Sequence, residues 1–155
     1  GILKALGMAG ANLIISKGSI EISKSYMKAF EIDATESPDL FPPLVALASY
    51  CNGITRIKGA SRLVHKESDR ASALSEEFGK MNIKVEIIGD HLLVTGGKVK
   101  GAKVNSHDDH RIAMAEAVAA LGASDTVFIK DSHCIAKSYP GFFDDLRKIG
   151  AMVHE

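Results

Sequence analysis

The chain repeats a pattern of residues with a period of about 70, and this repeat is the feature that most limits its possible folds. Asp39 and Asp109 each precede an apolar segment with helical spacing. Lys66 and Lys137 each follow the strand expected after that segment. Charged residues therefore recur at matched places, which favours a pseudo-symmetric arrangement of similar units.

The match divides the chain into one incomplete unit and two fuller ones. We expect the end of a truncated repeat in residues 1–28, a second repeat in 29–95 and a third in 102–155. Residues 2–7 have the spacing of the last turns of a helix whose start is missing. This opening favours a piece of a longer protein.

Two of the expected helices are apolar on almost every side. They span residues 44–51 and 112–121, and Glu116 is a lone charge in the second. A helix that is apolar all round is buried all round. The strands of this chain alternate between apolar and polar residues, so one face of each sheet should meet water. The sequence thus predicts an α/β (α+β) fold with helices inside and sheets outside, the reverse of a doubly wound fold.

The other expected elements follow from alternation, turn residues and helical spacing. Hairpins are expected where Lys17-Gly18 and Gly89-Asp90 separate alternating runs. The remaining predictions are strands at 29–33, 54–57, around Val104 and at 126–129, helices from the charged cluster to about Lys80 and at 140–149, and a short final strand at Met152-Val153.

Composition excludes several classes of protein. Lys plus Arg and Asp plus Glu both number 19, so the net charge indicates neither nucleic acid nor an anionic membrane as partner. Cys51 and Cys134 lie far apart without CxxC spacing, which indicates neither a zinc site nor a disulfide framework. With no apolar run of transmembrane length and no signal peptide, a reduced, cytoplasmic protein is expected.

The stretch Lys66-Glu67-Ser68-Asp69-Arg70 carries the densest charge next to an expected helix. If it opens that helix, Lys66 and Arg70 form a repulsive i,i+4 pair near the positive end of the helix dipole. Two interpretations are open: local ion pairs with Glu67 and Asp69, or an anionic ligand at the helix start.

Helix starts of one orientation gather at one end of a pseudo-symmetric domain, so their cations should converge. Asp39 and Glu67 would then be carboxylates in a cationic pocket, available for proton transfer. The converging cations would make a deep site for phosphate and carboxylate groups, and they are Arg62, Lys66, Arg70, Arg111 and Lys137.

Structural interpretations of the same residues remain open. Asp39 after Pro38 could be an N-cap, Arg111 could neutralise its acidic neighbours, and Lys137 could be an ordinary surface lysine. His110 stands beside Asp109, but no Ser or Cys completes a nucleophilic set. His107, His110 and His133 are too dispersed to predict a metal site.

Four motifs appear in order along the chain: Pro38-Asp39, Arg62-x-x-x-Lys66-Glu67-Ser68-Asp69-Arg70, Asp109-His110-Arg111-Ile112-Ala113-Met114 and Ala136-Lys137-Ser138-Tyr139-Pro140-x-Phe142-Phe143. Together they resemble the C-terminal part of the EPSP synthase (3-phosphoshikimate 1-carboxyvinyltransferase) family, over residues 1–155. The family is the glyphosate target of the shikimate pathway. Its fold is two similar domains, each made of three βαβαββ units around buried parallel helices, in agreement with the repeat described above.

The resemblance implies catalytic roles position by position. Asp39 matches the base at the 5-hydroxyl of shikimate 3-phosphate, and Glu67 the proton donor and acceptor beside the phosphoenolpyruvate methylene. His110 matches a histidine close to the cations that hold phosphoenolpyruvate, and Asp109 would orient it. Arg62 falls where some members place asparagine against shikimate 3-phosphate.

The resemblance also implies the binding set and the reaction. Lys66 matches a lysine between the two substrates, and Arg70, Arg111 and Lys137 match the cations that hold phosphoenolpyruvate. Phosphoenolpyruvate is protonated at C3, the hydroxyl adds at C2, and loss of a C3 proton with phosphate leaves the enolpyruvyl ether. No metal or other cofactor is implied.

The family's N-terminal domain, which supplies the other half of the site, is missing from these 155 residues. We therefore expect no transferase activity from this chain alone, and a monomer at full length. Two alternatives remain: an enolpyruvyl transferase acting on UDP-N-acetylglucosamine, and a non-catalytic anion-binding domain of the same fold.

Overall fold

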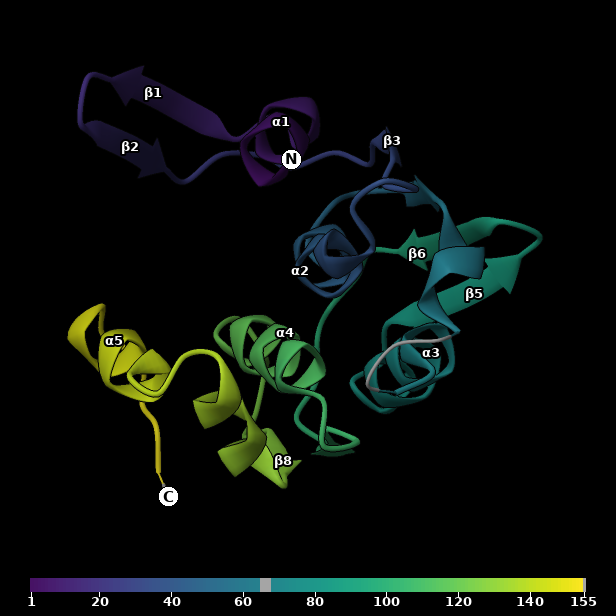
Figure 1. The fold of residues 1–155 in the computed structure, drawn as a ribbon. Helices are drawn as coiled ribbons and strands as arrows, with labels where there is room; N and C mark the ends of the chain where they lie inside the picture. Colours follow the sequence, from purple (N-terminus) through teal and green to yellow (C-terminus); the bar gives the residue numbers. More distant parts are fainter. Residues whose placement is uncertain (65–67, 155) are drawn as a thin grey trace.

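The computed structural model describes residues 1–64 and 68–154 (Figure 1). Three short 3-10 helices, η1 to η3, precede or connect the longer elements. The α-helices are α1 (Ile2–Ala9), α2 (Phe41–Ala48), α3 (Arg70–Lys80), α4 (His110–Ala120) and α5 (Phe142–Lys148). The strands are β1 (Asn12–Ser16), β2 (Ser19–Ser23), β3 (Glu31–Asp33), β4 (Ile54–Lys58), β5 (Lys84–Ile88), β6 (His91–Thr95), β7 (Lys103–Asn105) and β8 (Phe128–Lys130).

Strands β1 and β2 form the first predicted hairpin, which extends away from the other elements beside α1 (Figure 1). Ser16 pairs with Ser19, so Lys17 and Gly18 form the two-residue turn, and Gly18 takes a φ of 89°. The four isoleucines of this hairpin are exposed, including Ile15 and Ile22, and Leu13 is half-buried. The hairpin therefore contributes little to the core of the described chain.

The main sheet has the order β3-β4-β6-β5. Strand β3 pairs with β4 in parallel, while β6 lies antiparallel between β4 and β5. Along β4 the side chains alternate between exposed and buried, and Ile57 faces the core. One face of the sheet thus meets water, as the alternation predicts.

Helices α2 and α4 lie in the interior, which confirms the predicted arrangement of buried helices and outer sheets. Phe41, Leu44 and Val45 of α2 are fully buried, as are Ile112 and Ala119 of α4. The two helices pack against each other (Figure 1), and the Tyr50 hydroxyl after α2 donates a hydrogen bond to the Ala119 carbonyl of α4. Of the outer positions on α4, Val118 is exposed.

The later elements repeat this succession with a smaller sheet. Parallel strands β7 and β8 flank α4 in sequence, and η3 (Ser132–Lys137) leads to α5. The predicted strand at Met152-Val153 is wrong, because these residues have no strand assignment. The two units differ in their sheets. In the earlier unit β6 lies between β4 and β5 and pairs with both. Among the described residues, β7 and β8 pair with each other and no third strand extends their sheet.

The starts of several helices come together at one end of the buried layer. Before α2 lies η1 (Pro38–Leu40), and before α3 lies η2 (Ala60–Leu63), which contacts η1. Gly59 allows this contact: its φ is 106°, and a Cβ there would lie 2.6 Å from the Cα of Thr35. The close approach brings the segment that carries Asp39 towards the start of α3.

Two further findings concern the chain as a whole. Cys51 and Cys134 are both buried free thiols. Within residues 1–64 and 68–154, the helices are too short or too polar to cross a membrane.

Candidate functional site

Four charged side chains from three helix starts form one ion-paired group, the helix-start cluster: Asp39, Arg70, Asp109 and Arg111. Asp39 belongs to η1, Arg70 is the first residue of α3, and Asp109 is the N-cap of α4. Arg111 follows in the first turn of α4. The predicted convergence of charged helix starts is present for these four residues.

The Arg70–Asp109 pair is the buried centre of the cluster. Both side chains have no exposed surface; Arg70 Nε lies 2.7 Å from Asp109 Oδ2, and Nη2 lies 3.4 Å from Oδ1. Ser68 Oγ is 3.1 Å from the same carboxylate, and the backbone N–H of Arg111 donates to it over 2.9 Å. A guanidinium and a carboxylate that both lose water need such complete hydrogen bonding.

Burial by itself raises the pKa of Asp109, because it disfavours the charged form. Hydrogen bonds from Arg70, from the Arg111 backbone and from Ser68, with the charge of Arg70, outweigh this effect and hold the pKa below its usual value. Asp109 is therefore an anion at neutral pH and a fixed partner for Arg70.

Asp39 lies between the two guanidinium groups. Arg70 Nη1 donates to its Oδ1 over 2.7 Å, and Arg111 Nη2 lies 3.0 Å from its Oδ2. Its side chain is 47% exposed. The alternative of a helix N-cap is wrong, because Ser37 and Leu40 are the caps of η1 and α2 and neither helix has a side-chain cap bond.

Lys137 ends η3 and pairs with Asp108 beside the cluster. Its Nζ lies 2.7 Å from Asp108 Oδ2 and 3.2 Å from the Asp108 carbonyl. The hydrogen bond lowers the pKa of Asp108 and raises that of Lys137. His107 and Asp108 both take positive φ angles, 53° and 56°, so this turn holds an uncommon backbone conformation.

The other predicted site residues have separate positions. Arg62 in η2 is exposed, and among described residues its side chain has no hydrogen bond or ion pair. His110 is half-buried at the start of α4 and likewise has no side-chain partner within the described ranges. Lys66 and Glu67 lie outside the described residues.

The structure changes the interpretation of the charged stretch in two ways. Helix α3 begins at Arg70 with Asp69 as its N-cap, whose carboxylate accepts from Ser72 N, so the helix starts at the last residue of the stretch. Carboxylates from elsewhere in the chain neutralise Arg70, and no ligand is needed for that. The predicted repulsive pair with Lys66 falls partly outside the described residues.

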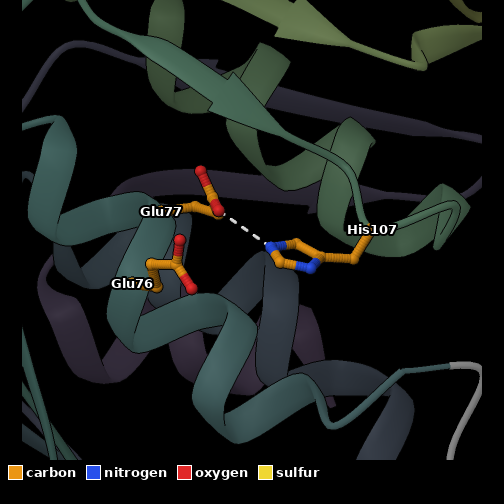
Figure 2. Close-up of side chains that lie close together, drawn as sticks. All are labelled: Glu76, Glu77 and His107. Carbon is orange, nitrogen blue, oxygen red and sulfur yellow. Dashed lines mark hydrogen bonds and ion pairs between the residues drawn. The ribbon is translucent and has the colours of Figure 1, made fainter.

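A second polar group, the Glu77 cluster, lies two turns further along α3. It comprises Glu76, Glu77 and His107, which Figure 2 shows, together with Lys80. The His107 ring points at Glu77, with Nε2 2.8 Å from Oε1, and the Asn105 N–H donates to Oε2 over 2.9 Å.

Glu76, Glu77 and His107 have the spacing of metal ligands. Lys80 Nζ, however, lies 2.9 Å from both Glu76 Oε1 and Glu77 Oε1. The lysine thus supplies the positive charge that these carboxylates require, and the geometry gives no reason to add a metal ion.

Glu116 is a buried acidic residue that, within the described part of the chain, lacks the ion pair and hydrogen bonds of Glu77. It lies on α4 with no exposed surface, and among the described residues neither carboxylate oxygen has a hydrogen-bond partner. Burial, and then the negative charge of Glu77, raise the pKa of Glu116 to about 8, while Lys80 opposes them. Glu116 is therefore mostly a neutral acid at pH 7.

Sequence reasoning treated several of these residues only in passing. Glu116 was visible as the one charge in an apolar helix, and this is the signal that finds it. The Glu77 cluster had no comparable signal, because Glu77 and His107 come from distant segments that meet only in the fold. The partnership of Asp108 with Lys137 depends on a turn with positive φ, which sequence spacing does not reveal.

Solved structures identify the class of protein. An EPSP synthase from Acinetobacter baumannii superposes with a TM-score of 0.86 and 27% identity, covering 95% of this chain and 38% of that one. An enolpyruvyl transferase from Streptomyces tendae shares the fold at a TM-score of 0.77 and 20% identity, covering 99% of this chain and 35% of that one. The fold is that of the enolpyruvyl transferases.

The sequence places the chain within this class. The family described as EPSP synthase (3-phosphoshikimate 1-carboxyvinyltransferase) matches residues 1–146, so the chain belongs to the EPSP synthase family. Curated relatives named 3-phosphoshikimate 1-carboxyvinyltransferase include those of Thermococcus kodakarensis, 41% identical over 95% of this chain, and Clostridium acetobutylicum, 43% identical over 99%. The chain spans 37% and 35% of their lengths.

Proposed function

We propose that this chain forms part of an enzyme that transfers the enolpyruvyl group of phosphoenolpyruvate to the 5-hydroxyl of shikimate 3-phosphate and releases phosphate. The observation that carries the proposal is the helix-start cluster: two guanidinium groups and a half-exposed carboxylate converge at one end of an EPSP synthase fold. Guanidinium groups suit the carboxylate and phosphate of phosphoenolpyruvate.

The anionic groups of phosphoenolpyruvate would be held by Arg70, Arg111 and Lys137. Arg111 and Lys137 suit direct contact because their side chains are 36% and 54% exposed. Arg70 is enclosed and also bound by Asp109, so its role is to present one edge of its guanidinium group in a fixed orientation. Preorganised cations of this kind stabilise departing phosphate without rearrangement during the reaction.

The proton transfers are assigned to Asp39, Glu67 and His110. Glu67 or His110 gives a proton to C3 of phosphoenolpyruvate, and the 5-hydroxyl bonds to C2 as Asp39 takes its proton. A C3 proton then returns to the protein, the double bond re-forms, and the C2–O bond to phosphate breaks. The exposure of Asp39 supports its assignment, because a base must reach the hydroxyl.

The acceptor side of the site would involve Asp39, Arg62 and Lys66, with further residues from the remainder of a full-length enzyme. The exposed position of Arg62 is consistent with contact to a second substrate across a cleft. We propose that the full-length protein is a cytoplasmic monomer of the shikimate pathway and a glyphosate target, and that substrate closes its two domains on each other.

The test is phosphate release from phosphoenolpyruvate by the polypeptide at the full length of its relatives. Release should require shikimate 3-phosphate, and UDP-N-acetylglucosamine should not replace it. Glu67→Gln should lower kcat by about 10²–10⁴-fold, whereas Glu76→Gln, on the exposed face of α3, should leave kcat unchanged. Normal turnover by Glu67→Gln would disprove the catalytic assignment, and release without the acceptor would disprove the proposed reaction.

A further inference from the structure

The carboxylate of Asp39 occupies the place that an anionic ligand needs in the helix-start cluster. One oxygen bonds Arg70 Nη1 at 2.7 Å and the other lies 3.0 Å from Arg111 Nη2. Two guanidinium groups from different helix starts thus bind the two oxygens of one carboxylate. Arginines bind the carboxylate or phosphate of a substrate in the same manner.

The charges of the cluster are already balanced. Arg70 and Arg111 contribute two positive charges, and Asp39 and Asp109 contribute two negative charges. Lys137 is likewise matched by Asp108. Among the residues that the structure describes, an incoming anion therefore finds these three cations each paired with a carboxylate of the chain itself.

Among the described residues, Asp109 and Asp39 both bind Arg70, and they differ in how easily they could be displaced from it. Asp109 has no exposed surface and is bound by Arg70, Ser68 and the Arg111 backbone. Asp39 is 47% exposed and lies on a three-residue 3-10 helix. Its departure would leave Arg70 paired with Asp109, so the core need not rearrange.

We propose that Asp39 is an internal occupant of the anion site, which an anionic ligand must displace from Arg70 and Arg111 in order to bind. The inference rests on the proposed function for the identity of that ligand, the carboxylate or phosphate of phosphoenolpyruvate. Phosphate alone tests the displacement, since any anion of this chemistry competes with Asp39 for the same N–H groups.

Displacement also couples binding to the proton transfer assigned to Asp39. While Arg70 and Arg111 donate to both of its oxygens, the carboxylate is poorly placed to accept the proton of the 5-hydroxyl. An anion that takes over the two guanidinium groups removes these two contacts from Asp39. Binding of phosphoenolpyruvate thus opens the carboxylate oxygens to the 5-hydroxyl on the side that Arg70 and Arg111 occupy in the free protein.

The experiment is a titration of the 155-residue chain with inorganic phosphate, followed by the ¹H–¹⁵N signals of the arginine side chains. Asp39→Asn keeps the shape of the side chain and removes the competing charge, so phosphate should bind about tenfold more tightly than in the parent. Glu36→Gln is the matched control, because it removes an exposed negative charge three residues away and should change the affinity less. Arg111→Ala should abolish the tighter binding.

The parent chain offers a second measurement that does not depend on the folding of a variant. Saturating phosphate should move the carboxyl ¹³C signal of Asp39 and leave that of Asp109 in place. The proposal is overturned if Asp39→Asn binds phosphate no more tightly than Glu36→Gln, or if the Asp39 signal stays unchanged while phosphate binds. Failure of phosphate to bind either protein also overturns it, whereas the proposed reaction is decided separately by turnover of the full-length enzyme.

Discussion

Helices α3 and α4 meet through two sets of charged residues that differ sharply in how their charges are satisfied. At the helix starts, Arg70 of α3 pairs with Asp109, the N-cap of α4. Glu77 lies seven residues after Arg70 on α3, and Glu116 lies seven residues after Asp109 on α4. These two acids are close enough for the charge of Glu77 to raise the pKa of Glu116. In the first set opposite charges bond each other, although Arg111 Nε has no hydrogen-bond partner among the described residues. In the second set neither oxygen of Glu116 has a partner in the same part of the chain.

The difference shows how one helix pair can hold an ionic site at one end and a protonated acid in its core. A buried guanidinium needs its carboxylate to remain charged, and the pKa of Asp109 is accordingly lowered. A buried acid without donors loses its charge instead, and the pKa of Glu116 is raised to about 8. Only the first set reaches the solvent, through Asp39 and Arg111.

The largest loss of stability is expected from removing a member of the first set, which we call the ionic set. Asp109→Ala leaves the buried Arg70 without its enclosed partner, which typically costs about 3–5 kcal/mol of unfolding free energy. Urea denaturation of the 155-residue chain at pH 7 measures this loss. A loss below 1 kcal/mol would contradict the account of Arg70 and Asp109 as a buried, mutually dependent pair.

Removing the protonated acid Glu116 should raise the free energy of unfolding, whereas Asp109→Ala should lower it. Glu116→Met fills a similar volume without placing unpartnered oxygens in the core. A buried polar group without a hydrogen-bond partner costs about 1–3 kcal/mol, so its replacement by an apolar side chain should stabilise the chain by a similar amount, and thermal unfolding at pH 7 would show this as a higher Tm. A lower Tm would indicate that Glu116 has partners that stabilise it.

The third prediction concerns pH. The pKa of Glu116 is about 8 in the folded chain against 4.5 for the unperturbed group, so between these values the unfolded state releases a proton that the folded state keeps. Glu116 thus makes stability fall as pH rises from 4.5 to 8, by up to about 1.4 kcal/mol per pH unit. Glu116→Gln should flatten this slope, as measured by unfolding at pH 5.5 and 7.5. An unchanged slope would refute a protonated Glu116.

The smallest effect is expected at the exposed neighbour of the ionic set. Asp108→Asn removes the charge that pairs with Lys137 and keeps a side chain that tolerates the positive φ of this position, and the side chains of both partners are more than half exposed. Exposed ion pairs contribute about 0–1 kcal/mol, so unfolding in urea should hardly change. If the unfolding free energy fell as much as in Asp109→Ala, burial would not be the reason why the two aspartates differ in their contribution to stability.

Much of the fold could be predicted from the sequence because the decisive signals are local. Apolar residues on every side of two segments predicted the buried helices α2 and α4, and two-residue turns predicted both hairpins. The strand at Met152-Val153 failed because a strand depends on a neighbour. Alternation within one segment cannot report whether that neighbour is present.

The candidate site was predicted only as a set of residues. The repeat placed Asp39, Arg70 and Arg111 at related helix starts, and the structure joins them. Which charge pairs with which could not be predicted, because the pairing depends on side-chain reach and burial in the assembled fold. The sequence suggested a ligand as the partner of Arg70, where the fold supplies Asp109 and Asp39.

The most direct test compares the two sets in one assay, the release of phosphate from phosphoenolpyruvate and shikimate 3-phosphate by the full-length enzyme at pH 7. Asp39→Ala, in the ionic set, should lower kcat by about 10²–10⁴-fold. Glu116→Gln, in the buried acid set, should leave kcat within about threefold of the parent, since a neutral amide replaces a mostly neutral acid. Normal turnover by Asp39→Ala, or an equal loss in Glu116→Gln, would contradict the assignment of the active site to the helix starts.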